Sequence, residues 1–186
     1  ARINSFELAF RMQTDAREAF DISGEKPATV IKYGNSAQGR QMMIARRLLE
    51  RGVRFVQVTQ DGWDLHNGIA SRAKRNASQL DPAIGALMDD LKERGMFKDT
   101  LIYITSEFGR TPREDGRGGR GHNKSAMSTV LAGGGIKGGM AYGSTDEIGG
   151  AAEENPVHVK DIHATILNQL GFDHEQLTFR VGGRPF

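Results

Sequence analysis

Hydrophobic and polar positions follow two different periods along this chain, and each period predicts one kind of element. Stretches in which apolar residues recur every three or four positions predict helices. A proline in the first turn restarts one of them, and glycines end others. The expected helices run over residues 3–19, 36–51, 69–80, 82–94 and 159–170.

Three shorter stretches are β-branched, and they are either alternating or continuously apolar, which predicts strands. They span residues 53–59, 100–105 and 128–132, and polar loops over 60–68 and 106–124 follow the first two. The order of strands and helices predicts an α/β fold with a three-layer, mostly parallel sheet flanked by helices. In such sheets ligands bind beyond the carboxyl ends of the strands, which is where these loops lie.

Size and composition place the chain among globular proteins. Its 186 residues are 38% apolar and 26% charged, which predicts one α/β domain over 1–186. No apolar run is long enough to span a bilayer, so we expect no membrane span. The net charge of +2 comes from interspersed charges, which does not favour nucleic acid as a partner. The start shows neither a signal peptide nor an initiator Met, which suggests a trimmed chain or a fragment.

Cysteine and glycine usage narrow the chemistry. The chain has no cysteine, so a metal would have to be held by His, Asp, Glu or Asn side chains. Glycine reaches 24 of 186 residues, against an average of about 7%. Most of the excess lies between Gly109 and Gly150, where the backbone can therefore approach a ligand closely.

The first candidate cluster follows the strand predicted at 53–59. Asp64 and His66 are two positions apart, so both side chains point to one side of an extended segment. A carboxylate and an imidazole that converge there would suit a divalent ion such as zinc or manganese. The alternative is structural: Asp64 and Asn67 would cap the next helix while His66 packs beside Trp63.

The second cluster follows the strand predicted at 100–105. Glu107 could ligate a metal there, and Arg110 could clamp an oxyanion through its fork of donors. The alternative is a mutual ion pair between the two residues that pins the loop. Ser106 and Thr105 lie nearby without an evident base, so no catalytic nucleophile is identified.

The third cluster is the sequence REDGRGGRGHNK at 113–124, a cationic loop with one histidine. Composition alone favours a solvated loop. Its position after Glu107 makes His122 a candidate ligand or proton donor, and makes Arg113 and Arg120 candidate anion-binding residues.

Two further segments have structural interpretations. The glycines at 133–139 lack the order of a phosphate-binding loop, which favours a turn that leaves a strand. Asp161 is expected to be a first-turn acid of the last helix, and His163 a packed histidine.

The motifs taken in order are more specific than any one of them. A strand that ends in TSEFGR at 105–110 precedes GHN at 121–123, then AGGGIKGG at 132–139 and DIHATILNQLG at 161–171. This order resembles the C-terminal half of the sulfatase and alkaline-phosphatase superfamily. It most closely resembles a large bacterial family of sulfatase-like proteins of unassigned function. The resemblance covers nearly everything from Val53 to Phe186.

The resemblance implies roles for individual residues. Glu107 stands where sulfatases place the metal-binding Asp of TSDHG, and Phe108 stands where they place its His. His66 and His122 would then supply nitrogen ligands, with Asp64 either a ligand or an acceptor that orients His66. The family's N-terminal half, which carries the nucleophile, has no counterpart in this chain. The fold implied is an incomplete alkaline-phosphatase-like domain.

The function implied is metal-dependent hydrolysis of phosphate or sulfate esters by the full-length protein. The cofactor would be Zn or Mn, or else Ca or Mg. One partner would be the substrate, either a small anionic ester or a sulfated glycan, and the other would be the missing N-terminal half of the same protein. Members of this family look exported or periplasmic. The alternative is a non-catalytic, sulfatase-derived binding or scaffold domain for anionic glycans.

Overall fold

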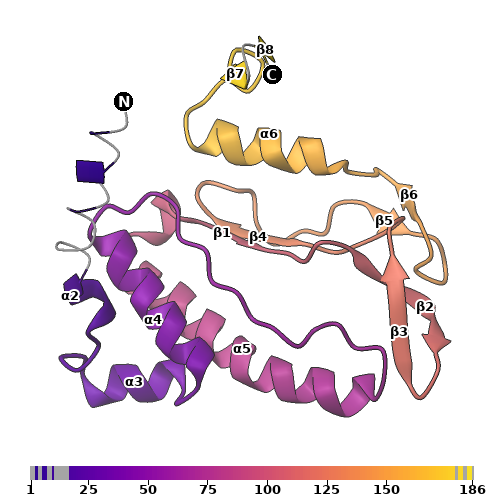
Figure 1. Ribbon diagram of the computed structural model, residues 1–186, viewed down its shortest axis with the longest axis horizontal. Coiled ribbons are helices and arrows are strands. Elements are labelled where there is room, and N and C mark those ends of the chain that lie inside the picture. Colours follow the sequence, from indigo (N-terminus) through magenta and orange to yellow (C-terminus); the bar gives the residue numbers. More distant parts are fainter. Residues whose placement is uncertain are drawn as a thin grey trace. The chain divides into compact units, whose positions relative to one another are not determined.

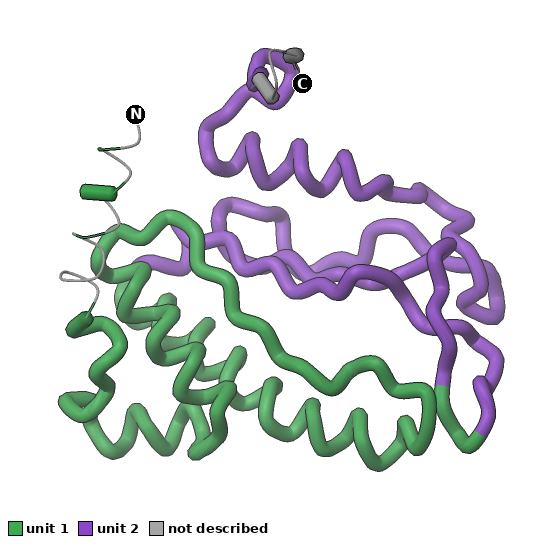
Figure 2. The backbone as a smooth tube through the Cα atoms, viewed as in Figure 1, with its two compact units in different colours: residues 1–95, 117–119 green, residues 96–116, 120–186 purple. Residues whose placement is uncertain are grey.

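The computed structural model describes residues 3, 6–7, 10, 17–178, 180–181 and 184–185, and its elements are labelled in Figure 1. It is a mixed α/β structure: the described residues form five α-helices and four small two-stranded sheets. The chain divides into two compact units, coloured separately in Figure 2. Unit 1 holds residues 1–95 and 117–119, and unit 2 holds residues 96–116 and 120–186.

Unit 1 is helical, and every hydrophobic side chain that is fully buried in the described residues lies in it. Its helices are α2 (Arg17–Phe20), α3 (Pro27–Tyr33), α4 (Ala37–Glu50) and α5 (Ile69–Glu93). The buried side chains recur at helical spacing on α4 and α5, because one stripe of each helix faces the core. They are Ala19, Tyr33, Met43, Ala45, Leu65, Ala83, Ala86, Leu87 and Leu91.

The predicted limits of α4 are confirmed, and those of α5 are corrected. The Ser36 hydroxyl caps α4 by accepting a hydrogen bond of 3.0 Å from the Gly39 amide. The restart expected at Pro82 is wrong, because α5 continues through this proline from Ile69 to Glu93. The buried positions after the proline keep one helical face, whose packing offsets the lost hydrogen bond.

A charged cluster lies between the helices of unit 1. The Arg46 side chain is 2% exposed and pairs with Glu25 at 2.8 Å and with Glu50 at 2.9 Å. Its Nε lies 3.4 Å from Asp90, which also accepts a 3.0 Å hydrogen bond from the Tyr33 hydroxyl. These contacts connect α3, α4 and α5.

The strand expected at 53–59 does not form among the described residues. The segment is neither helix nor strand, and no described residue makes a hydrogen bond to the backbone of residues 54–58. Strand propensity reflects packing on a sheet more than an intrinsic backbone preference, so it cannot form a strand without a neighbour.

Unit 2 contains the strands. They are β1 (Leu101–Ile104), β2 (Gly109–Asp115), β3 (Gly119–Asn123, whose first residue belongs to unit 1), β4 (Val130–Gly133), β5 (Ser144–Thr145), β6 (Ala152–Glu154), β7 (Arg180–Val181) and β8 (Arg184–Pro185). A short 3₁₀ helix, η1 (Phe97–Asp99), precedes β1, and α6 (Val159–Gln169) follows β6.

The strands predicted at 100–105 and 128–132 are confirmed as β1 and β4, but not as parallel neighbours. They pair antiparallel, with Leu101 opposite Gly133 and Ile104 opposite Val130. A parallel pair needs a crossover, usually a helix, whereas residues 105–129 contain only a hairpin. The described residues therefore show no parallel sheet and no three-layer arrangement.

The loop expected over 106–124 is also corrected, because most of it forms the β2–β3 hairpin. The sequence Asp115-Gly116 is a turn signal, and Gly116, Arg117 and Gly118 all have positive φ. This hairpin presents His122 on an ordered strand.

The remaining expectations concern the ends of elements. The glycines after β4 form the expected turn, and a Cβ at Gly133 would lie 2.4 Å from the Thr100 carbonyl oxygen. Asp161 is confirmed as a first-turn acid, since it accepts a 2.8 Å hydrogen bond from the His158 amide in a capping box. The helix expected over 3–19 lies largely outside the described residues, but residues 3, 6–7 and 10 are helical and its end forms α2.

Membrane-spanning segments were expected to be absent. None of the described helices is both long and apolar enough to cross a bilayer.

Candidate metal centre

The Asp64-Leu65-His66 segment precedes α5 and forms a tight turn, in which the Asp64 carbonyl accepts a 3.3 Å hydrogen bond from the His66 amide. Leu65 is buried, with 2% of its surface exposed, and this fixes the direction of its neighbours. Asp64 and His66 are both exposed, and the turn brings their side chains together. His66 Nε2 lies 3.0 Å from Asp64 Oδ1.

The structural alternative for this segment is not found. The N-cap of α5 is Gly68, and no side chain caps the helix. Asn67 instead accepts a 2.8 Å hydrogen bond from Arg72, and the Trp63 indole donates to Gln60 at 2.9 Å. Asp64 therefore does not cap α5.

The backbone of the β2–β3 turn takes the place of a side-chain cap. The Arg117 carbonyl accepts a 3.1 Å hydrogen bond from the Gly68 amide, and the Gly118 carbonyl accepts one of 2.9 Å from the Ile69 amide. Both carbonyls belong to unit 1 and satisfy amides at the start of α5 that would otherwise be unpaired.

Gly119 brings this turn into contact with His66. A Cβ at Gly119 would lie 2.0 Å from the His66 carbonyl carbon and 2.5 Å from the Asn67 nitrogen. Any side chain at this position would therefore push the two backbones apart. The missing side chain is what allows the start of β3 to lie against the His66 peptide.

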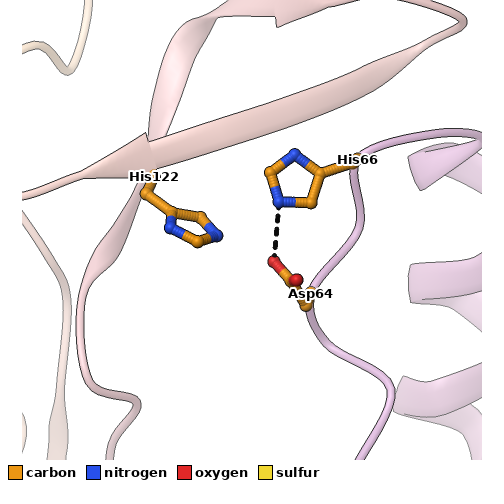
Figure 3. A group of neighbouring side chains, drawn as sticks. All are labelled: Asp64, His66 and His122. Carbon is orange, nitrogen blue, oxygen red and sulfur yellow. Dashed lines mark ion pairs between the residues drawn. The ribbon is translucent and has the colours of Figure 1, made fainter.

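His122 follows Gly119 by three positions on β3, which is a reach of roughly 10 Å along a strand. Asp64, His66 and His122 each offer one ligand atom, and these atoms lie within 4.8 Å of one another. Figure 3 shows the carboxylate and the two imidazoles together, with a dashed line for the Asp64–His66 pair.

The chemistry of the three side chains fits a divalent metal. Two imidazole nitrogens and one carboxylate oxygen are typical of catalytic zinc sites and of other open transition-metal sites. All three residues are exposed, so an ion can enter and further coordination positions would remain open.

Within unit 2, aromatic packing positions His122. The rings of His122 and Phe108 are 4.1 Å apart and tilted by 31°. The Arg110 guanidinium lies 5.7 Å from the centre of the Phe108 ring, and its Nη1 donates to the Arg120 carbonyl at 3.3 Å. Phe108 therefore lies between Arg110 and His122.

The other predicted site residues occupy different positions. Glu107 is exposed on the bend between β1 and β2 and does not belong to the group of three ligands. It also forms no ion pair with Arg110 among the described residues, so the structural alternative for that pair is not found. Arg113 is exposed on β2, and Arg120 is half-buried on β3.

Three residues of the site were missed by sequence reasoning. Gly119 was only one of many glycines, and Phe108 was noted only as the replacement of a histidine. Asn123 was treated as part of a loop, although its side chain is 8% exposed and holds a second loop in place. The Asp115-Gly116 turn signal could have identified the hairpin that carries two of these residues.

Comparison with known proteins gives a family and no function. No curated protein and no solved structure matches the chain. The sequence profile of one family, described as "Protein of unknown function (DUF1501)", matches residues 1–186. The chain therefore belongs to the DUF1501 family.

Proposed function

We propose that Asp64, His66 and His122 form a divalent-metal site in a hydrolase of phosphate or sulfate esters. The observation that carries this proposal is the convergence of two imidazoles and a carboxylate within 4.8 Å at the surface. Bound there, the ion would act as a Lewis acid on the ester oxygen. Zinc or manganese suits two nitrogen donors better than calcium or magnesium, which prefer oxygen.

The residues of this chain bind and neutralise the ester. Arg110 and Arg120 lie on the same hairpin as His122 and would counter the charge of the anion, whereas Arg113 lies beside Glu114 and Asp115 in a neighbouring cavity. Ser106 and Thr105 are poor nucleophiles, because their hydroxyls donate to the Phe108 carbonyl at 2.8 Å and the Ser106 carbonyl at 3.0 Å. The nucleophile would therefore come from water or from another part of the protein.

The proposal includes a larger setting for the domain. In an alkaline-phosphatase-like protein of sulfatase type, residues 53–59 would be a strand of a larger, mostly parallel sheet. The N-terminal half of that protein would supply its neighbouring strands and the nucleophile, and the protein would be exported or periplasmic.

A second candidate is a non-catalytic binding domain for anionic glycans. Phe108 stands where sulfatases have a histidine, and Glu107 lies outside the ligand group. This leaves one group of three ligands, which could serve a structural ion as well as a catalytic one.

Metal titration by calorimetry tests the proposal, with zinc and manganese as probes. We expect one ion per chain, and a loss of affinity of at least about 100-fold in His66→Ala and in His122→Ala. The control is His174→Ala, which changes an exposed histidine outside the group. A wild-type chain that binds neither ion would overturn the metal site.

Substrate assays then separate the two candidates. A panel of phosphate and sulfate esters is assayed with the longest available form of the protein loaded with metal. Turnover that is lost in His66→Ala supports the hydrolase. Metal binding without turnover of any ester supports the binding domain.

A further inference from the structure

Unit 2 contains a cavity of about 550 Å³ beside β2 and β3. Its wall includes His122, so the cavity adjoins one ligand of the proposed metal site. The residues that carry the argument are Arg113, Glu114, Asp115, His122 and Ile148.

One wall of the cavity is a loop that is fixed from two sides. Asn123 donates to the Gly150 carbonyl at 3.0 Å and to the Gly149 carbonyl at 3.3 Å. The Asp146 carboxylate accepts hydrogen bonds from the Gly150 amide at 2.6 Å and from the Ala151 amide at 3.0 Å. The loop is therefore held in shape by hydrogen bonds that do not use the Ile148 side chain at its tip.

The tip of this loop presents an apolar side chain to the cavity. Ile148 lines the cavity and is 68% exposed, so its apolar surface is largely uncovered. Covering such a surface with the carbon face of a ligand stabilises a complex.

The polar groups of the cavity include both hydrogen-bond donors and hydrogen-bond acceptors. Arg113 offers only donors, whereas Glu114 and Asp115 offer only acceptors, about four sites on each carboxylate. An anionic group would meet two carboxylates and one cation, and is therefore disfavoured. A neutral group with many hydroxyls can donate to the carboxylates and accept from the arginine.

We infer that this cavity binds the neutral, hydroxyl-rich alcohol part of the ester, such as a sugar ring. The inference rests on the proposed function, because it takes His122 as the boundary between the anionic centre and the alcohol. Ile148 would pack on the carbon face of the ring, and Glu114 and Asp115 would accept its hydroxyls. The preferred substrate would be a singly charged sugar ester.

NMR titration of the ¹⁵N-labelled chain with neutral methyl hexosides tests the inference. We expect saturable shifts of the Thr111, Gly121 and Gly150 amides, and about fivefold weaker binding in Ile148→Ala. The matched control is Val157→Ala, which removes an exposed apolar side chain outside the cavity wall and should not weaken binding.

Charge variants and a competing probe sharpen the test. Inorganic sulfate should shift these amides less than the hexosides do. In the double variant Glu114→Gln, Asp115→Asn, the shifts caused by sulfate should come closer to those caused by the hexosides, because both carboxylate charges are removed. The inference is overturned if no hexoside shifts these amides, or if sulfate binds there more strongly than the sugars.

The readouts for the cavity and for the metal are independent. Hexoside binding should persist in His66→Ala, which lacks a metal ligand but keeps every side chain of the cavity wall. A chain that binds metal but no sugar contradicts this inference alone. A chain that binds sugar but no metal contradicts the proposed metal centre and leaves the sugar site in place.

Discussion

At the scale of single residues, the pairing of Asp64 with His66 is the contact on which the site depends. The sequence predicted this convergence from the alternation of an extended segment. The structure achieves it through a tight turn around buried Leu65, in which the His66 amide donates to the Asp64 carbonyl. Glu107, which was predicted as a further ligand, lies outside the group of three, and its position depends on how β1 leads into β2.

In the proposed metal site, the Asp64 carboxylate would either ligate the ion or orient the His66 ring. In both cases Asp64→Asn removes a charge next to the ion, so we expect metal affinity to fall by about 10–100-fold. Calorimetric titration with zinc measures this, with Asp61→Asn as a control three positions upstream. Equal affinity in Asp64→Asn and wild type would show that this carboxylate takes no part.

The loop at 146–150 should lose its shape in acid. The hydrogen bond from the Gly150 amide, supported by that from Ala151, holds the pKa of Asp146 below its ordinary value of 3.8. A lowered pKa means that the carboxylate's contribution is complete above about 3.8 and is lost as the pH falls through the lowered value.

An NMR pH titration of the Gly150 amide measures this effect. We expect a transition below pH 3.8 in the wild type and none in Asp146→Asn. A wild-type transition above this value would contradict the hydrogen-bonding account.

At the scale of elements, the β2–β3 hairpin decides whether the site forms. Its turn carbonyls bind the start of α5 two positions after His66, and His122 follows on the same strand. The sequence predicted a loop here because charged and glycine-rich residues dominate. The long-range contact between Gly119 and His66 has no local signature.

Two substitutions on the same strand test this role of the hairpin. Gly119→Ala should weaken zinc binding by at least about tenfold, because its Cβ would lie 2.0 Å from the His66 backbone. Gly121→Ala should be tolerated, since its nearest neighbour would lie at 3.5 Å, an ordinary contact. Calorimetry gives the affinities and circular dichroism checks the fold. Equal zinc affinity in the two variants would contradict the proposed positioning.

The Arg46 cluster should contribute strongly to the stability of unit 1. Burial opposes ionisation of both Glu25 and Arg46, but their hydrogen bonds overcome it: the pKa of Glu25 is lowered and that of Arg46 is raised. Arg46→Met would leave Glu25 and Asp90 without this partner, which should cost about 3–5 kcal/mol.

Urea unfolding, followed by helical circular dichroism, measures the change in Arg46→Met. The control is Arg54→Met at an exposed position, where we expect a change within about 0.5 kcal/mol. A similarly small change in the free energy of unfolding of Arg46→Met would mean that the buried ion pairs contribute almost nothing to stability.

At the scale of the whole molecule, the distribution of burial is uneven. Among the described residues, all fully buried hydrophobic side chains belong to unit 1, whereas β1 is only half-buried along its length. Two-stranded sheets are marginally stable by themselves. This agrees with the proposal that the strands belong to a larger sheet.

Hydrogen exchange tests that proposal at residues 54–58. These amides have no acceptor among the described residues, so we expect them to exchange much faster than the amides in the middle of α5. In a longer form of the protein with the proposed parallel sheet, they should become protected. Fast exchange in the longer form too would contradict a strand at this position.

The sequence by itself determined the local features. These are the helix α4, the helix α6 with its first-turn acid Asp161, the strands β1 and β4, the glycine turn and the convergence of Asp64 with His66. Each depends on side chains within a few positions of one another. Only the tertiary structure decided the antiparallel pairing of β1 with β4, the β2–β3 hairpin and the contact of Gly119 with His66. These depend on which distant segments meet, and the free energy of such contacts is not encoded in any short stretch of residues.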